Sequence, residues 1–102
     1  MPRRYYVYIL ASRAFGPIYI GMTNDPVSRI IEHGEGRGSK HVTKYKIFRL
    51  VYIEDHVMAA DAIKREQSLK RWRRAWKDEM IERDNPNWHD LFDNLKTDLM
   101  LD

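Results

Sequence analysis

The sequence predicts an α+β fold, a small three-stranded antiparallel sheet flanked by helices. Two segments rich in Tyr, Val and Ile, residues 4–11 and 18–23, have the composition of strands, and the turn signal Phe15-Gly16-Pro17 between them indicates an antiparallel pair. Residues 48–54 form a third strand by the same criterion. Most of the remaining chain has helix start signals or the periodicity of a helix, so helices should flank the sheet.

Composition restricts the class of protein. Hydrophobic residues make up 43% of the chain and charged residues 32%, which is typical of a globular domain and argues against disorder. The absence of cysteine excludes disulfides and cysteine nucleophiles. No apolar run approaches the roughly 20 residues that span a bilayer, and the basic start lacks a signal-peptide core, so we expect a cytoplasmic protein. We expect one domain at residues 1–95 and a C-terminal tail at residues 96–102.

The segments around the second strand should shape a site. Strand alternation places Tyr19 and Gly21 on one face, where the bare backbone at Gly21 suits the close approach of a ligand. Asp25 can cap a helix that follows it, and this helix should end at Gly34. The glycine-rich residues 34–40 should then form a flexible basic loop.

A long helix is expected after the third strand, beginning near Val57 with Asp55 as its cap. A period of 3.6 residues separates two stripes on it. The apolar stripe consists of Ala62, Leu69, Trp72 and Trp76, and the second stripe of Glu66, Lys70, Arg73 and Lys77. We therefore expect both tryptophans in the core rather than as platforms for base stacking. A short final helix should carry Trp88, Leu91, Phe92 and Leu95, with a frayed end from residue 96.

Charge is unevenly distributed, although the net charge is only +3. Residues 64–77 contain seven Lys or Arg and one acid, whereas residues 78–102 contain two Lys or Arg and eight acids. This pattern indicates a polyanion partner at one surface, with solvated helix faces as the alternative. The residues expected to contact phosphate, with little reading of bases, are Arg37, Lys40, His41, Lys64, Arg65, Lys70, Arg71, Arg73, Arg74 and Lys77.

Glu66 is a candidate metal ligand. It is the only acid in the basic run, and a lone carboxylate there can hold Mg²⁺ or Mn²⁺ while water and phosphate oxygens complete the coordination. The alternative is an ion pair with Lys70, four positions later on the same helix. No His-x-x-x-His pair is present, so a zinc site is not expected.

Four other side chains suit the hydrolysis of a phosphodiester, which requires activation of water and stabilisation of developing charge. Arg29 can donate two N–H groups to phosphate oxygens, or it is an ordinary surface arginine. Tyr8 and Tyr19 are packing residues, or they act on the attacking water. A phenol has a pKa of about 10, so a base role requires stabilisation of its anion. His33 can relay a proton or bind phosphate, or it merely favours the end of a helix.

These residues occur in the order of a known family. Tyr6-Val7-Tyr8, then Tyr19-Ile20-Gly21, Arg29 and His33, resemble the motifs of the GIY-YIG nuclease superfamily. The likeness is to its small stand-alone bacterial single-domain members, which are similar to the N-terminal nuclease domain of the excinuclease that acts in excision repair. The resemblance implies the GIY-YIG endonuclease fold and a divalent-metal-dependent endonuclease that acts on DNA, in repair or another process directed by DNA structure.

The resemblance also implies a role for each catalytic residue. Tyr8 and Tyr19 would position and activate the attacking water, and the sequence leaves open which of them removes the proton. Arg29 would contact the scissile phosphate, and His33 would assist. Glu66 would be the ligand of Mg²⁺ or Mn²⁺.

The sequence departs from the family in places. Met22 and Thr23 stand where some members carry a lysine that helps to deprotonate the tyrosine, so lysine assistance is not expected. Either Asn85 or Asn87 matches a late asparagine near the family's active site. Larger family members add a DNA-recognition domain, and none is evident here. The target, DNA or RNA, would therefore be chosen by its structure, through a protein partner, or with hardly any selection. Two other functions stay open: a nucleic-acid-binding module with little cleavage, and a protein-interaction module that uses the acidic tail.

Overall fold

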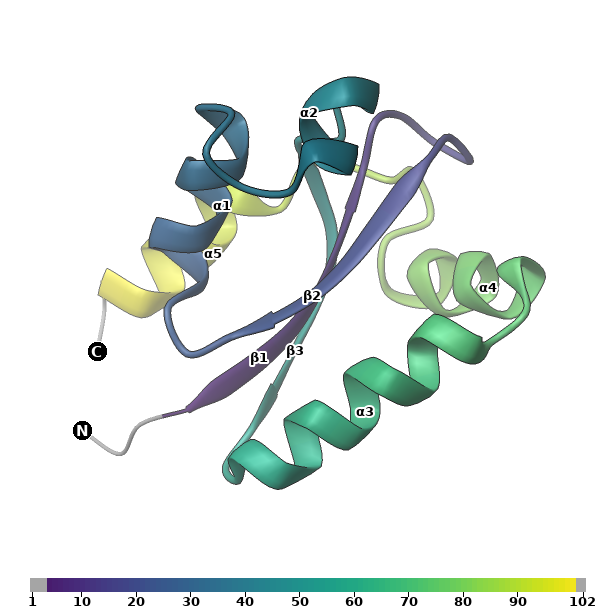
Figure 1. Ribbon diagram of the computed structural model, residues 1–102. Coiled ribbons are helices and arrows are strands. Elements are labelled where there is room, and N and C mark those ends of the chain that lie inside the picture. Colours follow the sequence, from purple (N-terminus) through teal and green to yellow (C-terminus); the bar gives the residue numbers. More distant parts are fainter. Residues whose placement is uncertain (1–3, 101–102) are drawn as a thin grey trace.

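The computed structural model describes residues 4–100 and contains a three-stranded sheet (Figure 1). Its strands are β1 (Tyr5–Ala11), β2 (Ile18–Thr23) and β3 (Arg49–His56). β1 lies in the middle and pairs antiparallel with both neighbours. The helices are α1 (Pro26–Gly34), α2 (Lys40–Tyr45), α3 (Ala59–Arg71), α4 (Arg74–Asp84) and α5 (Phe92–Met100). The predicted α+β class, an antiparallel sheet flanked by helices, is confirmed.

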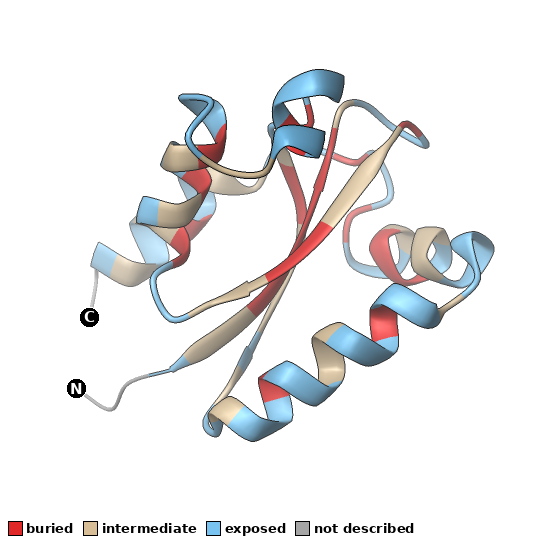
Figure 2. Ribbon diagram, in the orientation of Figure 1, coloured by how far each residue is buried: buried red, intermediate tan, exposed pale blue. Residues whose placement is uncertain are grey.

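The helices form two layers, one on each face of the sheet. α3 and α4 cover one face, and α1, α2 and α5 cover the other (Figure 1). Buried residues line the sheet on both sides (Figure 2). The core under α3 and α4 contains Val7, Ile9, Ala11, Ile20, Val51, Ala62, Leu69, Met80, Ile81 and Trp88. The core under α1, α2 and α5 contains Tyr8, Leu10, Ile30, Val42, Ile47, Leu50 and Leu95.

α1 begins and ends where the sequence predicts. Asp25 caps it by accepting a 3.3 Å hydrogen bond from the backbone N–H of Ser28, and Gly34 is its last residue. The following segment differs from the prediction, because Lys40–Tyr45 forms the short helix α2, capped by Ser39. Lys40, the last residue of the predicted loop, is therefore the first residue of a helix, and His41 follows it on that helix.

β3 is longer than predicted, and its length moves the start of α3. The strand runs to His56, so Asp55 lies within it and accepts a 2.7 Å hydrogen bond from Arg4. Met58 takes the N-cap position of α3 and makes no side-chain capping bond. The prediction that Asp55 caps this helix was wrong, because pairing with β1 extends the strand past that residue.

The prediction of a single long helix was also wrong, because the chain bends between α3 and α4. α3 ends at Arg71, and Trp72 has an extended backbone with a ψ of 149°. The break ends the predicted apolar stripe, since Leu69 is fully buried whereas Trp76 is 49% exposed. Trp76 is therefore not a core residue, and Trp72 is only partly buried against the core.

α5 begins later than the sequence predicts. Trp88 precedes it in a left-handed backbone conformation with a φ of 55°, and this side chain is fully buried. Asp90 accepts a 3.0 Å hydrogen bond from the N–H of Phe92, the first helical residue. The helix continues to Met100, so residues 96–100 are not frayed, while residues 101–102 lie outside the described part. The boundary between residues 1–95 and 96–102 stays a prediction. Within residues 4–100, no helix has the length and apolarity to cross a membrane.

Candidate active site

A phenol and an imidazole meet inside the core under α1. The hydroxyl of Tyr8 and Nε2 of His33 share a buried hydrogen bond of 3.0 Å. Tyr8 lies in the middle of β1 and His33 in the last turn of α1, and both are almost fully enclosed. The ring of Tyr19 lies edge-on to His33, with centroids 5.1 Å apart, and its centroid is 6.3 Å from that of Tyr8. Three of the five predicted catalytic residues thus form one cluster.

Two glycines provide the space for this cluster. Gly21 faces Tyr8 across the paired strands, and a Cβ atom at Gly21 would collide with Cζ and the hydroxyl of Tyr8. A Cβ atom at Gly38 would collide with Nδ1 of His33. The space beside Gly21 is therefore filled by a phenol of the same chain, not left for a ligand as the sequence indicated. The backbone at Gly38 covers the Nδ1 edge of the imidazole.

Burial favours the neutral form of both partners. It raises the pKa of the Tyr8 phenol well above the ordinary value of 10.0, and Tyr19 raises it further. The positive charge of Arg29 lowers the pKa of Tyr8, and the negative charge of Glu66 raises it. Burial also lowers the pKa of His33, and Arg29 lowers it again. A phenolate at this position therefore requires nearby positive charge or hydrogen-bond donors.

Arg29 lies one turn before His33 on α1. Its Nη1 donates a 3.1 Å hydrogen bond to Glu32, and a little over a third of each of these side chains is exposed. Since its charge acts on the pKa values of both Tyr8 and His33, the guanidinium lies at the boundary between the cluster and solvent. An incoming phosphate would compete with Glu32 for this guanidinium.

Glu66 approaches the cluster from the opposite layer. It lies in the middle of α3, its side chain is 21% exposed, and its carboxylate is 3.4 Å from Nζ of Lys70. The predicted alternative, an ion pair with Lys70, is therefore present. Its charge also raises the pKa of Tyr8, so the carboxylate and the phenol are within electrostatic range.

The residues present fit a metal ion held by one carboxylate. No group of three or more His, Cys, Asp or Glu side chains within the described range could enclose a metal. Mg²⁺ commonly takes only one or two carboxylates and keeps water and substrate phosphates as its other ligands. The partly buried Glu66 suits that kind of binding, whereas it does not suit a structural site with several protein ligands.

Basic side chains approach β2 from both layers. Nε2 of His41, on α2, lies 3.3 Å from the backbone carbonyl of Ile18 at the start of β2. From the other layer, Nη2 of Arg74 donates a 2.5 Å hydrogen bond to the carbonyl of Gly16, just before β2. His41 and Arg74 therefore bind backbone carbonyls two residues apart, where the edge strand that carries Tyr19 begins.

The predicted phosphate contacts differ in how far they are already engaged. Arg37, Lys70 and Arg74 form ion pairs with Glu35 at 2.6 Å, Glu66 at 3.4 Å and Asp78 at 2.7 Å. Nζ of Lys77 donates to the carbonyl of Lys70 at 3.4 Å, and burial, followed by Arg74, lowers its pKa. Lys40 and Arg73 are exposed and form no ion pair with residues 4–100. Their binding of nucleic acid stays a prediction.

Two neighbours of the cluster, Glu32 and Gly38, were not predicted from the sequence. The spacing of Arg29 and Glu32, three positions apart on a helix, was a usable signal for their ion pair. No local signal in the sequence identified Gly38, because its contact with His33 depends on how the loop folds back.

Asn85 is one of the two asparagines that the sequence left as alternatives. It is buried, and its amide donates to the carbonyls of Val51 and His89 at 3.1 and 2.9 Å, so it holds the segment before α5 against β3.

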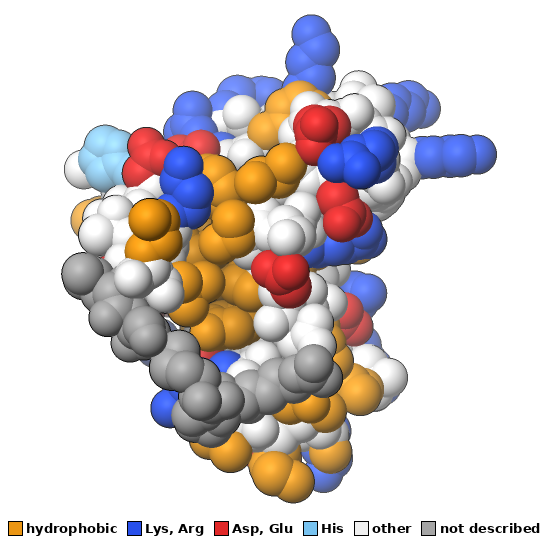
Figure 3. Space-filling model, turned by 90° about the vertical axis from the view of Figure 1, so that its left-hand side faces the viewer, with side chains coloured by type: hydrophobic (Ala, Val, Ile, Leu, Met, Phe, Trp, Pro, Cys, Tyr) orange, Lys and Arg blue, Asp and Glu red, His pale blue; other side chains and the backbone are white. Residues whose placement is uncertain are grey.

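The face that carries α1 and α5 has a different character. Hydrophobic side chains gather in its middle, and acidic side chains lie among them (Figure 3). A hollow of about 170 Å³ beside α5 is lined by Tyr6, Ile53, Glu54, Asp55, Leu95, Asp98 and Leu99. Its three carboxylates would repel phosphate, so this hollow is not suited to nucleic acid.

The fold and the cluster define a compact α+β domain with paired tyrosines, an arginine and a histidine beside an edge strand. The sequence matches the family model described as the GIY-YIG catalytic domain over residues 4–79. The chain therefore belongs to the GIY-YIG domain family, which is a nuclease family. The predicted resemblance is confirmed.

Similar proteins are also small members of this family. A UPF0213 protein of Staphylococcus epidermidis is 33% identical over 79 residues, which cover 78% of this chain and 95% of that protein. A UPF0213 protein of Bacillus pumilus is 35% identical over 78 residues, covering 76% of this chain and 79% of the relative. The solution NMR structure of a UPF0213 protein from Bacillus halodurans is 32% identical, with a TM-score of 0.49, and covers 78% of this chain and 83% of that one.

Proposed function

We propose that this protein is a divalent-metal-dependent endonuclease that hydrolyses phosphodiester bonds in DNA and selects its target by DNA structure, as in repair. The observation that carries the proposal is the buried Tyr8–His33 hydrogen bond with Tyr19 beside it. The charges of Arg29 and Glu66 both act on Tyr8. This combination of phenols, a guanidinium and a carboxylate supports chemistry at a phosphate.

His33 would orient the Tyr8 hydroxyl through one tautomer. Nδ1 of His33 is buried against Gly38 and has no hydrogen-bond partner among residues 4–100. An unpaired buried N–H is rarer than an unpaired acceptor, so we place the ring proton on Nε2. That N–H donates to the Tyr8 oxygen, which leaves the phenolic proton free to point elsewhere. The same N–H would stabilise a phenolate at Tyr8.

The tyrosines would share the handling of the attacking water. Tyr19 is only partly buried, so it can hold a water molecule against the enclosed Tyr8. Tyr8 can accept a proton only when its anion is stabilised, because burial opposes the charge. Arg29 and the Nε2–H of His33 supply that stabilisation, and Arg29 can also bind a phosphate oxygen.

Glu66 is the residue that would hold Mg²⁺ or Mn²⁺. When bound, such an ion supplies stabilisation of the charge that develops on the phosphate and on the leaving oxygen. Neutralising Glu66 would also remove one of the negative charges that raise the pKa of Tyr8.

A second candidate function is a nucleic-acid-binding module of the same fold with little cleavage. The raised pKa of Tyr8 favours this alternative, since a phenol that holds its proton is a poor base. The two functions differ in one measurable respect. A nuclease forms product when metal is added, whereas a binding module shows at most a change in affinity.

The test is a cleavage assay with flapped, branched, nicked, single-stranded and duplex DNA and with RNA, each in Mg²⁺, Mn²⁺ or EDTA. We expect cleavage of a branched or flapped DNA with metal, and loss of it in Glu66→Gln with binding retained or tightened. Asp61→Asn is the matched control, because Asp61 is an exposed acid in the first turn of the same helix. Cleavage by Glu66→Gln at the wild-type rate contradicts the metal assignment. Cleavage of RNA alone would make the protein a ribonuclease instead.

A further inference from the structure

Two tryptophans, one partly buried and one exposed, form a corner where α3 passes into α4. Trp72 directly follows α3 as its C-cap residue, and Trp76 lies in the first turn of α4. Their rings are nearly perpendicular, at 83° with centroids 6.3 Å apart. Trp76 is 49% exposed, although a tryptophan side chain has a large apolar surface to bury. The guanidinium of Arg73 lies 5.4 Å from the centre of the Trp76 ring. Trp76 belongs to neither core of the fold, whereas Trp72 packs in part against the core under α3 and α4.

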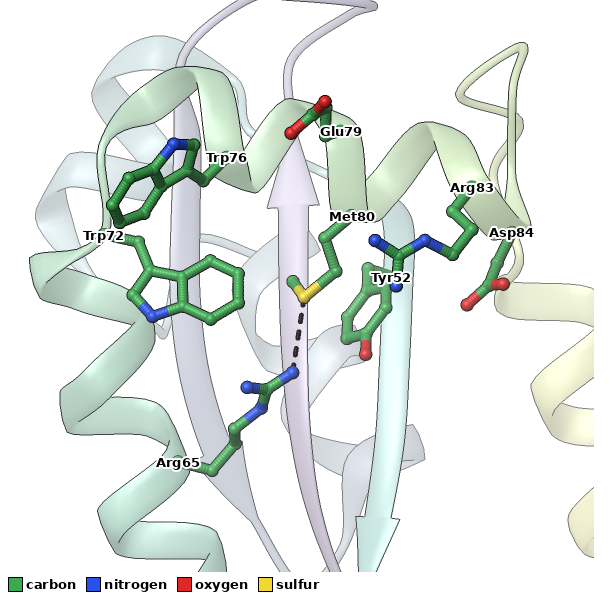
Figure 4. A pocket seen from close by; sticks show the side chains of 8 residues that line it. All are labelled: Tyr52, Arg65, Trp72, Trp76, Glu79, Met80, Arg83 and Asp84. Carbon is green, nitrogen blue, oxygen red and sulfur yellow. Dashed lines mark hydrogen bonds between the residues drawn. The ribbon is translucent and has the colours of Figure 1, made fainter.

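A hollow lies on each side of the corner, and the two differ in charge. One, of about 330 Å³, is lined by Lys64, Gln67, Ser68, Arg71, Trp72 and Trp76 and contains no carboxylate. The other, of about 270 Å³, adds Tyr52, Arg65, Glu79, Met80, Arg83 and Asp84 to the two tryptophans (Figure 4). In that second hollow the carboxylates oppose phosphate, and Arg65 is already bonded to Glu54 at 3.1 Å. The first hollow is the one suited to a polyanion.

The first hollow follows one face of α3. Its four polar side chains occupy positions 64, 67, 68 and 71, a spacing that puts them in one continuous row along the helix. Glu66 lies roughly 150° away from this row at 100° per residue, so it is on nearly the opposite flank of the helix. An α-helix is about 10 Å across with its side chains, so a few nucleotides of extended chain would pass from one flank to the other.

We propose that this basic aromatic hollow binds the unpaired nucleotides of a single-stranded segment. A base stacks on Trp76, and Lys64 and Arg71 bind the flanking phosphates. Bases of any identity present a π-face, and stacking on exposed aromatic side chains combined with a basic groove is the usual way to hold single strands. Duplex DNA, with a persistence length of about 150 base pairs, is too stiff to bend around one helix.

The proposal deepens the proposed function and rests on it for the role of the strand. If Glu66 marks the reacting phosphate, a strand that leaves it around α3 must be unpaired. The preferred substrate would then carry a single-stranded arm, as in a flap. The binding of that arm, however, requires neither metal nor chemistry, and it can be measured separately.

The test is the binding of a fluorescently labelled hairpin duplex with a short single-stranded tail, followed by anisotropy in EDTA. Two tails of equal length and charge are compared, one with ordinary bases (the natural tail) and one abasic. Each is tested with the wild-type protein, Trp76→Leu and Trp76→Phe. Phe48→Leu is the matched control, because Phe48 is another exposed aromatic residue, 38% exposed, just before β3. Stacking on an aromatic ring is worth about 1–3 kcal/mol per base, so we expect Trp76→Leu to weaken binding of the natural tail about 10-fold.

The abasic tail separates stacking from charge. Wild-type protein should bind it about 10-fold more weakly than the natural tail, Trp76→Leu should not distinguish the two, and Trp76→Phe should recover part of the difference. Equal binding of both tails by the wild-type protein overturns the proposal, as does an unchanged affinity in Trp76→Leu, and the corner would then be a contact for a protein. Because EDTA prevents metal-dependent cleavage, these outcomes are independent of whether the protein is a nuclease. A nuclease that fails this test would keep its proposed function and lose only the tail site.

Discussion

The Tyr8 hydroxyl lies 3.0 Å from Nε2 of His33, and the whole cluster is arranged around this buried hydrogen bond. The two residues are 25 positions apart in the chain, and they meet because β1 is the central strand and α1 packs across it. The contact is enclosed by residues without side chains, Gly21 under the phenol and Gly38 against the imidazole. Small changes around this pair should therefore have large effects.

Removing each tyrosine hydroxyl should separate chemistry from structure. Tyr8→Phe leaves a buried imidazole N–H without a partner, so we expect a loss of about 1–3 kcal/mol in the free energy of unfolding. Tyr19→Phe, at a partly buried position, should change stability little. If the phenols act on the attacking water, each change should lower single-turnover cleavage about 10²–10⁴-fold. Wild-type rates in both variants would show that the tyrosine mechanism is wrong even though the fold is right.

Gly21→Ala should damage the cluster without changing any polar group. Its methyl group would occupy the position of the Tyr8 phenol, and such overpacking typically costs about 1–3 kcal/mol. We expect a lower melting temperature and slower cleavage. Gly34→Ala is the control, because a Cβ atom there meets nothing within 4 Å. It lies at the end of α1, where alanine should be neutral or mildly stabilising. Equal melting temperatures for the two variants would refute the close packing at Gly21.

The stability of the protein should depend on pH through His33. Burial, and then Arg29, lower the pKa of this residue in the folded state, so the unfolded chain binds a proton more readily. The contribution of neutral His33 to the free energy of unfolding is fully present above the pKa of the unfolded chain, about 6.5. It is lost as the pH falls through the lower pKa of the folded state. Denaturant unfolding at several pH values should show this loss in the wild-type protein. His33→Gln, which keeps a donor for Tyr8 but does not titrate, should show a smaller dependence. An identical pH profile in the variant would mean that His33 does not titrate as the structure indicates.

Binding to duplex DNA should depend on salt through the basic residues near α4. Each neutralised phosphate contributes about 0.9 to the slope of log affinity against log salt. Replacing the exposed Arg73 and the partly buried Lys77 by Gln should reduce that slope, by up to about 1 for each residue that contacts a phosphate. Lys96→Gln is the control, since Lys96 lies on α5 beside Asp93, 3.7 Å away. A flat slope in the wild-type protein would favour a protein partner over a nucleic acid.

Local signals in the sequence determined the fold class and most of the candidate cluster. The turn at Phe15-Gly16-Pro17, strand alternation and the Asp25 cap depend only on near neighbours, so they could be read directly. The same is true of the order of Tyr8, Tyr19, Arg29 and His33, which placed the chain in its family. The structure adds the distances that make these residues a cluster, and their roles await the experiments above.

Only the tertiary structure decided where long-range packing overrides local preference. The periodicity of residues 62–76 predicts one helix, but the helix is interrupted at Trp72. As a result, α4 turns onto β3 and Trp76 stays exposed. The closure of Gly38 over His33 likewise depends on a loop returning to a helix that precedes it. Such contacts join parts of the chain whose sequences do not constrain one another locally, and the packed core selects among the conformations that local sequence allows.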